Sequence, residues 1–570
     1  MMTSRPTRKP LAACTLIMSL MAGGASSAPG LADAQGGGGL QTKATRTFLT
    51  PASCAPCHNQ GLPPLPEYLG EPEGNRLVML NEFQTWRTED KHSHAFDALT
   101  GARGMNMGKL LGYKEPGGAA MRKECLSCHS TGFQTSDLQG GLPETRRTAV
   151  SKRAQGVGCA SCHGMYKEWV GEHGLPGEPT DRWRQLSTQE KWRTYGMADL
   201  RNPATRARVC YSCHIGDSDE GKVVSHAMYA AGHPPLPGIE LATFENAEPK
   251  HWWKPREVPL FADREKAKPY GVDLDSLADT KSVVVGGVVA LRETLRLIAS
   301  QAEVKPEAAL WPDYAQFECY ACHHDLSVPA GGAIANWRQK RDESGLRPDG
   351  KKAGTPGRPL PRLWSLRLAR FAAEQAPGGG PGADGFDAAV DALWAEFDKA
   401  PFGNPAAVAG AARALETRAE SILASLEAMK FGPDAPAKFI RSLASLPGKE
   451  YPDYDTARQI AWAIKSISNE MTPKPDEGSA VAKVIAELSS SLKLDPFEGK
   501  SEYAKLIKDS KQAGDLLSAA LIKLSEGEYG KSRTTAANYN PDAFKQSLAN
   551  LLGALSGPPA ASPIGGGGGN

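Results

Sequence analysis

One five-residue pattern occurs five times in this chain of 570 residues: two cysteines separated by two residues and followed at once by a histidine. Proteins attach c-type haem at this pattern, because the thiols add to the haem vinyl groups while the histidine ligates the iron. A lone pair of cysteines at this spacing would also fit half of a zinc site or a redox dithiol. Ten of the eleven cysteines fall in the five copies, however, and every copy ends in histidine. We therefore predict five haems c, held at motifs 1 to 5 by Cys54, Cys57 and His58; Cys125, Cys128 and His129; Cys159, Cys162 and His163; Cys210, Cys213 and His214; and Cys319, Cys322 and His323.

The remaining histidines are candidate ligands for the opposite face of each iron. The chain has twelve histidines, so seven remain outside the motifs: His92, His94, His173, His226, His233, His251 and His324. Five of these would suffice to ligate every iron on its second face. His226 and His233 are seven residues apart, nearly on one face of a helix that Gly232 and Pro234 should end at His233. His324 directly follows the motif histidine, so it can ligate only a neighbouring haem or act as a hydrogen-bond partner. Both roles stay open.

The stretch from Cys54 to His323 lacks the periodic apolar faces that build an ordinary core. It is rich in Gly, Pro and aromatic residues, a composition that short helices and loops wrapped around haems would allow. Met105 and Met107 could supply axial thioethers, but with several imidazoles nearby we expect them to pack. Six tryptophans could pack against haem edges or in plain core: Trp86, Trp169, Trp183, Trp192, Trp252 and Trp253.

The first 34 residues have the pattern of an export signal. Arg5, Arg8 and Lys9 precede the short apolar run 11–21, and a small-x-small cleavage pattern would start the mature chain near residue 35. We expect Cys14 to be removed with this signal. We therefore predict a periplasmic or secreted protein with no integral membrane segment after cleavage. The later apolar run 283–291 is short and passes into charged residues, so we expect a packed helix there.

The formal net charge of +2 gives no electrostatic argument for binding nucleic acid or an anionic membrane. The chain after residue 340 changes character and contains neither cysteine nor histidine. We predict a haem domain at 35–340, a basic Gly/Pro linker at 341–361, a helical domain at 362–556 and a disordered tail at 557–570. A second low-complexity break is expected at 376–385.

Apolar residues at helical spacing predict the elements of the helical domain. Three faces are explicit, and the segments 516–524 and 544–555 indicate two more helices. The three faces consist of Phe386, Val390, Leu393, Trp394 and Phe397; Leu415, Ala419, Ile422, Leu426 and Met429; and Ala457, Ile460, Ile464 and Ile467.

Longer stretches around the motifs resemble the cytochrome c-554 family. The segment 86–96, which contains His92 and His94, is similar to the W-x5-H-A-x-A stretch after that family's first motif. Residues 124–133 resemble its second site. Residues 156–164, continuing to His173, closely resemble its third site on both sides of the haem motif, and motif 4 fits the fourth. The resemblance covers residues 50 to 215.

The resemblance implies a mainly helical multihaem domain with haems stacked in close pairs, bis-histidine ligation of most irons and a role in periplasmic electron transfer. His92 and His173 take the role of distal ligands, with His94 as an alternative to His92. One haem of that family has no sixth ligand. This chain departs from the family by having a fifth motif and a long C-terminal region, so the family's redox partner, the hydroxylamine-oxidising enzyme, is not carried over.

Two functions follow from these observations. The first is an electron carrier that passes electrons between redox partner proteins and brings no substrate to iron. The alternative is a multihaem reductase that reduces a small nitrogen or sulfur compound at one open-coordinate haem. The absence of a C-x-x-C-K site and of a recognisable acid–base group beside a motif favours the carrier. A unit of an extracellular haem wire is a third, weaker hypothesis.

Overall fold

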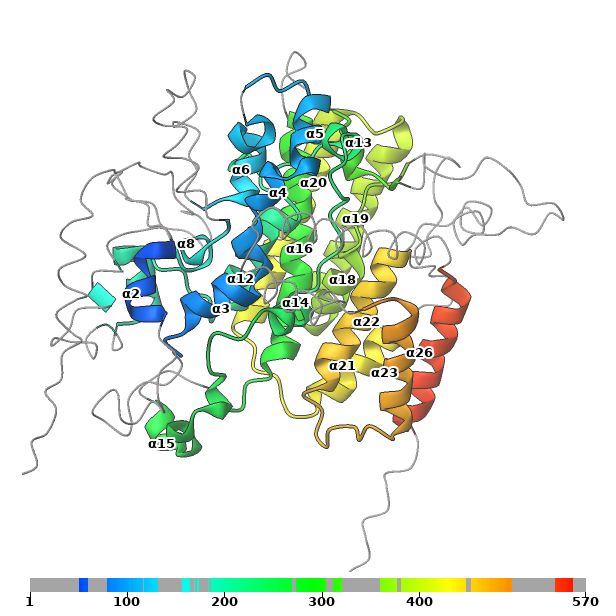
Figure 1. The fold of residues 1–570 in the computed structure, drawn as a ribbon. Coiled ribbons are helices and arrows are strands. Elements are labelled where there is room, and N and C mark those ends of the chain that lie inside the picture. Colours follow the sequence, from blue (N-terminus) through cyan, green and yellow to red (C-terminus); the bar gives the residue numbers. More distant parts are fainter. Residues whose placement is uncertain are drawn as a thin grey trace, which may run out of the picture. The chain divides into compact units, whose positions relative to one another are not determined.

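The structure is a computed structural model, and its elements fall into two compact units (Figure 1). Of the described residues, those between 51 and 235 and between 246 and 276 belong to unit 1, and those between 236 and 245, between 277 and 494 and between 539 and 556 belong to unit 2. The residues that the structure describes are 51–59, 79–115, 117–131, 156–164, 169, 172–173, 183, 186–268, 273–303, 311–319, 359–376, 381–446, 453–494 and 539–556.

The described residues form helices and no strand, which confirms the mainly helical fold predicted from the sequence. Strand-like pairing among them is limited to isolated bridges, Asp217 with Lys222 and Phe317 with Pro361. Within the described ranges, every helix is too short or too polar to cross a bilayer.

Unit 1 consists of short helices joined by loops. Its α-helices are α2 (Ala55–His58), α3 (Glu82–Glu89), α4 (Asp97–Thr100), α5 (Ala102–Leu110), α6 (Lys123–His129), α8 (Cys159–His163), α11 (Thr188–Glu190), α12 (Pro203–His214), α13 (His226–Ala230) and α15 (Arg264–Ala267). Turns of 3-10 helix join several of them, including η2 (Lys91–His94). Buried apolar side chains form only small groups here, such as Leu99 and Leu126 with neighbouring alanines. This sparse core agrees with the pattern expected of a domain whose apolar bulk comes from haem.

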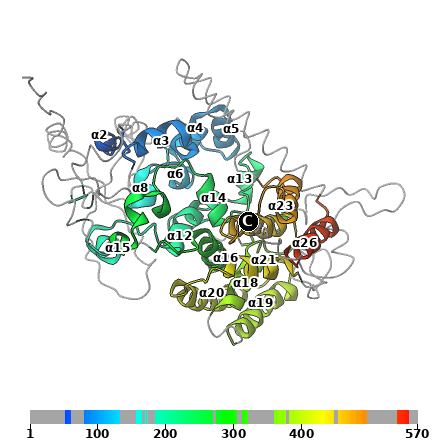
Figure 2. The same ribbon diagram turned by 90° about the horizontal axis from the view of Figure 1, so that it is seen from below.

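Unit 2 is built from longer helices (Figure 2). These helices bury continuous apolar faces. Its helices are α16 (Ala278–Glu303), α18 (Leu366–Gln375), α19 (Pro381–Lys399), α20 (Pro405–Glu427), α21 (Ala435–Ala444), α22 (Tyr454–Ser468), α23 (Ala480–Ser491) and α26 (Pro541–Ser556), while α14 (Leu241–Ala247) begins in this unit. Helix α16 packs against α18, α20 and α22, and α26 packs against α21 and α23. The run 283–291 is fully buried in α16, so the packed helix expected there is confirmed.

The three predicted apolar faces are present in α19, α20 and α22, where their members are buried. Met429 is the exception, because α20 ends at Glu427. Residues 544–555 lie in α26 as expected, whereas the helix predicted at 516–524 and the tail at 557–570 fall outside the described residues. The predicted break at 376–385 is too long, because α19 begins at Pro381.

The structure groups α16 and Cys319 with the C-terminal helices in unit 2, although the sequence led us to end the haem domain at residue 340. The reason is packing. The apolar face of α16 is covered by α18, α20 and α22. A cut near residue 341 would therefore uncover this apolar face.

Candidate functional site

Motifs 1 to 4 each sit at the C-terminal end of a helix, and each helix ends on the motif histidine. Residues at i, i+3 and i+4 share one face of a helix. The helical conformation therefore presents both thiols and the imidazole of each motif in one direction. In α12 the Asn202 side chain accepts hydrogen bonds from the backbone amides of Ala204 and Thr205, and Pro203 occupies the first turn, so this helix has a well-defined start.

The imidazoles of three motifs face histidines from elsewhere in the chain. The ring centroids of His58 and His173 are 6.2 Å apart, with planes at 18°. The corresponding separations are 6.3 Å for His214 with His92, and 6.4 Å for His129 with His233, with planes at 85° and 87°. Each pair joins one motif histidine to one non-motif histidine, as two-sided ligation of an iron would require.

The separation itself fits two imidazoles that share one metal ion. An imidazole nitrogen lies about 2 Å from a first-row metal that it ligates and about 1 Å from the centre of its own ring, so two trans ligands have centres about 6 Å apart. Aromatic rings in direct contact also have centres about 4.5–7 Å apart, so distance alone does not decide the role. The matching of motif with non-motif histidine in all three pairs favours shared ligation.

The Nδ1 atoms of five of the six paired histidines contact hydrogen-bond acceptors, so a metal would be bound through Nε2. His58 Nδ1 contacts Glu82 Oε2 at 2.8 Å, and His92 Nδ1 contacts Asp90 Oδ1 at 3.0 Å. In three other histidines the Nδ1 atom contacts a backbone carbonyl oxygen: Ala95 O for His129 at 2.7 Å, Trp169 O for His173 at 3.2 Å and Pro234 O for His233 at 2.7 Å.

The thiols of different motifs also meet. The Cys54 thiol shares a hydrogen bond with Cys159, which raises the pKa of Cys54 and lowers that of Cys159. A second hydrogen bond joins Cys128 to Cys213 with the same kind of opposed shifts in pKa. Cys162 lies within electrostatic range of Cys210, and α8 packs on α12. Motifs 1 to 4 are therefore neighbours in the order 1, 3, 4, 2.

Two glycines allow the third motif to pack closely on its surroundings. Gly156 has φ +77°, and a Cβ there would lie 2.5 Å from the carbonyl oxygen of His92. A Cβ on Gly158 would lie 2.2 Å from Pro51 Cγ. The backbone amide of Val157 donates to the His92 carbonyl at 2.9 Å, so this close approach fixes the turn that carries His92. Larger side chains at either glycine would separate motif 3 from that turn.

A comparison with known families supports this assignment of chemistry. The family described as "Cytochrome c554 and c-prime" matches residues 53–164, which contain motifs 1, 2 and 3. Residues 53–164 are thus similar to the cytochrome c-554 family. The protein is accordingly a c-type cytochrome that binds haem covalently and transfers electrons. No curated protein and no solved structure gives a significant match to the chain.

The polar atoms around the cytochrome motifs fit a haem with its two carboxylate side chains. Among the described residues, the buried Nε and Nη1 atoms of Arg208 have no hydrogen-bond partner, and neither does the buried indole N–H of Trp253. Arg208 lies on α12, the helix that carries motif 4. A guanidinium forms strong paired hydrogen bonds with carboxylates, so a haem propionate would satisfy this otherwise costly arrangement.

Burial favours the neutral form of four imidazoles near the motifs. Burial lowers the pKa of His214 and of His163 to about 4, and it also lowers the pKa values of His129 and His233. His92 behaves differently. Burial opposes its protonation, but the hydrogen bond and negative charge of Asp90 outweigh this effect and raise its pKa to about 9. A neutral imidazole is the form that ligates metal, so binding of iron would displace the proton of His92.

Motif 3 has an electrostatic neighbour in His251, whose proximity contributes to the low pKa of His163. His251 Nδ1 contacts Pro249 O at 2.9 Å, and its ring packs on Trp252 with centroids 4.7 Å apart. Its Nδ1 is thus engaged in the same way as in the three histidine pairs. His251 is therefore a candidate counterpart of His163.

The other described candidate ligands, His94 and His226, are not members of these three pairs. His94 Nδ1 contacts Asp97 Oδ2 at 2.9 Å, and His226 is the first residue of α13. The helix expected to run from His226 to His233 ends at Ala230, because Gly232 turns the chain with φ +113°. Of motif 5, the structure describes Cys319, which is exposed, whereas Cys322, His323 and His324 lie outside the described residues.

Sequence reasoning missed the carboxylates behind the imidazoles. Glu82, Asp90 and Glu248 contact paired histidines, yet no spacing in the sequence marks them. Asp90 carried the best signal, since it stands two residues before His92, at the spacing of a local cap. Glu248 is more than 150 residues from its partner, so only the folded chain brings the two together.

Proposed function

We propose that this protein transfers electrons between redox partner proteins through five covalently attached haems c, one at each motif. Haem iron supplies reversible one-electron chemistry, and the chain's part is to hold each iron, to fix its ligands and to keep neighbouring sites close. The histidine pairs of motifs 1, 2 and 4 are the observation that carries the proposal. We assign His173, His233 and His92 as their distal ligands, and His251 as that of motif 3.

The pair at motif 2 favours a carrier over a reductase. Reduction of a small molecule at iron requires a vacant coordination position. The resemblance to the cytochrome c-554 family led us to expect one iron without a sixth ligand. His233 instead stands opposite His129, with its Nδ1 engaged by the Pro234 carbonyl and its other ring edge available. This arrangement supports six-coordinate iron at motif 2, as at motifs 1 and 4, and hence the carrier.

The contacts between thiols support a continuous path. Since the cysteines of motifs 1 and 3, of 3 and 4, and of 4 and 2 are neighbours, the groups attached to them would lie edge to edge in that order. Short steps between redox centres are what an electron carrier needs. The position of motif 5 in this path stays a prediction, because most of that motif lies outside the described residues.

The proposal includes export and the domain organisation expected from the sequence. Residues 1–34 would act as a signal peptide that delivers the chain to the periplasm or the exterior. Residues 35–340 would carry the five motifs, 341–361 would link them to the helices of 362–556, and 557–570 would be a disordered tail. The donor and acceptor would be proteins, since electrons must enter and leave through exposed edges.

Mass spectrometry and magnetic resonance of the full-length mature protein test this function. We expect five haems per denatured chain and ferric iron that is low-spin at motifs 1, 2 and 4. His233→Ala should create one high-spin signal, because it removes a strong axial imidazole. Tyr229→Phe is the matched control, since Tyr229 packs on His233 with ring centroids 6.1 Å apart but supplies no imidazole. A spectrum unchanged by His233→Ala would refute the motif 2 assignment.

Turnover assays separate the carrier from the reductase. The reduced protein should pass electrons to other cytochromes and show negligible sustained oxidation by nitrite, hydroxylamine or tetrathionate. Catalytic reoxidation by one of these compounds, abolished by a change in a single distal pocket, would overturn the carrier in favour of the reductase.

A further inference from the structure

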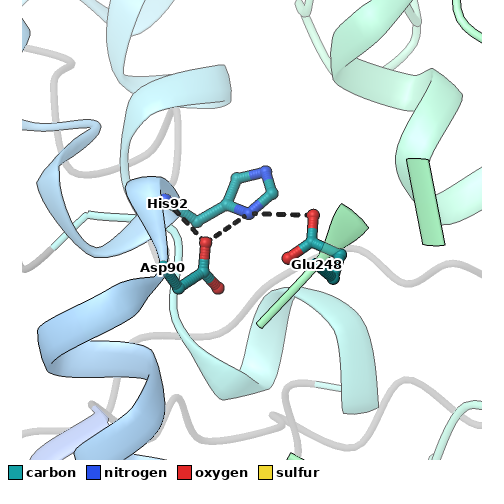
Figure 3. A group of neighbouring side chains, drawn as sticks. All are labelled: Asp90, His92 and Glu248. Atoms are coloured by element: carbon teal, nitrogen blue, oxygen red, sulfur yellow. Dashed lines mark hydrogen bonds and ion pairs between the residues drawn. The ribbon is translucent and has the colours of Figure 1, made fainter. Parts of the chain in front are cut away.

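The acceptors of the paired histidines differ in charge. At motif 2 both imidazoles donate to neutral backbone carbonyls, those of Ala95 and Pro234, each at 2.7 Å. At motif 4 the distal His92 faces two carboxylates instead (Figure 3). Its Nδ1 lies 3.0 Å from Asp90 Oδ1 and 3.7 Å from Glu248 Oε1. The two motifs are neighbours through Cys128 and Cys213, so the contrast lies between adjacent redox centres.

Asp90 is held firmly in this position. Its Oδ1 atom also accepts the backbone amide of His92 at 2.9 Å, and its backbone carbonyl accepts the Ser93 hydroxyl at 2.7 Å. The carboxylate therefore caps η2 and orients the ring of His92 at the same time. In Figure 3 the second nitrogen of the ring points away from both acids, as a ligand of iron at motif 4 would require.

A carboxylate behind an axial imidazole changes the electronics of the metal that the imidazole ligates. The acceptor draws the Nδ1 proton, makes Nε2 a stronger donor and so favours ferric over ferrous iron. The fixed negative charge acts in the same direction, because it stabilises the more positive oxidation state. A carbonyl has no net charge, so it has a smaller effect of each kind.

We propose that Asp90, assisted by Glu248, lowers the reduction potential at motif 4 below that at motif 2 and so directs electrons from motif 4 to motif 2. The proposal deepens the electron-transfer function and rests on the assignment of His92 and His214 as the ligands of one iron. Asp90 and Glu248 are tuning residues under this proposal, since they act on the iron only through His92.

Asp90→Asn in the full-length holoprotein tests the proposal. The asparagine side chain keeps an oxygen that can accept both the ring N–H and the His92 amide, but it carries no charge. In a potentiometric titration followed by optical and magnetic resonance spectra, one low-potential wave should move to more positive potential. We expect the reduced-to-oxidised ratio of that centre at a fixed potential to rise at least tenfold, which corresponds to a shift of about 59 mV for one electron.

Asp263→Asn is the matched control. Asp263 accepts the amide of Glu265, two residues ahead, at 3.0 Å, the same local geometry as Asp90 with His92, and it caps α15. The substitution removes the same charge from the same kind of turn, so it should leave all waves in place. Glu248→Gln should move the same wave as Asp90→Asn, but less, because Glu248 is farther from Nδ1.

His92→Ala distinguishes failure of this inference from failure of the proposed function. A high-spin signal in His92→Ala, together with a shifted wave in Asp90→Asn that retains low-spin iron, would support the proposal. A high-spin signal in His92→Ala without a shifted wave in Asp90→Asn would refute the tuning role and leave the ligand assignment standing. If His92→Ala left every iron low-spin, the ligand assignment would fail, and the tuning proposal would fall with it.

Discussion

Gly287 of α16 offers a sharp test of the packing in unit 2. It lies where α16 crosses α18, and a Cβ at this position would be 2.6 Å from Leu368 Cβ and 3.3 Å from the Leu368 carbonyl carbon. Ordinary contacts between carbon atoms are about 3.5–4.0 Å. Because backbone atoms of α18 take part, rotation of one side chain cannot relieve the clash, and the two helices must move apart.

Gly287→Ala should therefore destabilise the protein even though alanine is the better helix former. Overpacking of a tight core costs about 1–3 kcal/mol, whereas glycine to alanine in a helix gains up to about 1 kcal/mol. The close backbone approach places the cost at the upper end, so we expect a net loss of about 2 kcal/mol. For a unit of this size, that loss lowers the melting temperature by about 4–8 °C.

Gly410→Ala provides the control, because Gly410 is an exposed glycine of α20 with open space around its Cβ position. This variant should gain up to about 1 kcal/mol from helix propensity alone. Thermal unfolding followed by far-ultraviolet circular dichroism would compare the two, with haem content matched by absorbance. The same substitution should thus shift the melting temperature in opposite directions. If Gly287→Ala raised the melting temperature as is expected for Gly410→Ala, the inference that α16 and α18 cross too closely to admit a Cβ would be refuted.

Two further predictions concern unit 2. Burial beside Asp455 and Glu318 raises the pKa of Asp453 from an ordinary 3.8 to about 6. The folded state therefore prefers the protonated carboxyl, and ionisation of Asp453 as pH rises from about 4 to 6 lowers the free energy of unfolding by at most about 3 kcal/mol. Asp453→Asn keeps the helix cap but cannot ionise, so it should raise the midpoint of urea unfolding at pH 7.5 and leave the midpoint at pH 4 unchanged. An equal rise of the midpoint at both pH values would contradict the assigned pKa. Truncation after residue 340 should expose the apolar face of α16 that α18, α20 and α22 cover, and so produce aggregation or strong binding of a hydrophobic dye. A monodisperse truncated protein that binds no dye would show that α16 does not need those helices.

The sequence alone determined the chemistry of the cytochrome. Five short motifs predict covalent attachment and the proximal ligands, because a helix places residues i, i+3 and i+4 on one face whatever surrounds it. The longer signature around motif 3 identified the family that the comparison confirms for residues 53–164. The apolar faces of α19, α20 and α22 were equally visible, since a period of 3.6 residues is a local property of the chain.

The tertiary structure decided which groups meet. No spacing shows that His233 rather than His226 faces His129, because that choice depends on the turn at Gly232 after α13. The opposition of His214 to His92, and the approach of Glu248, join segments far apart in the sequence. The grouping of α16 with the C-terminal helices is likewise a matter of which apolar faces can cover one another. Local patterns fix the donor atoms of the cytochrome, and long-range packing fixes their partners and charges.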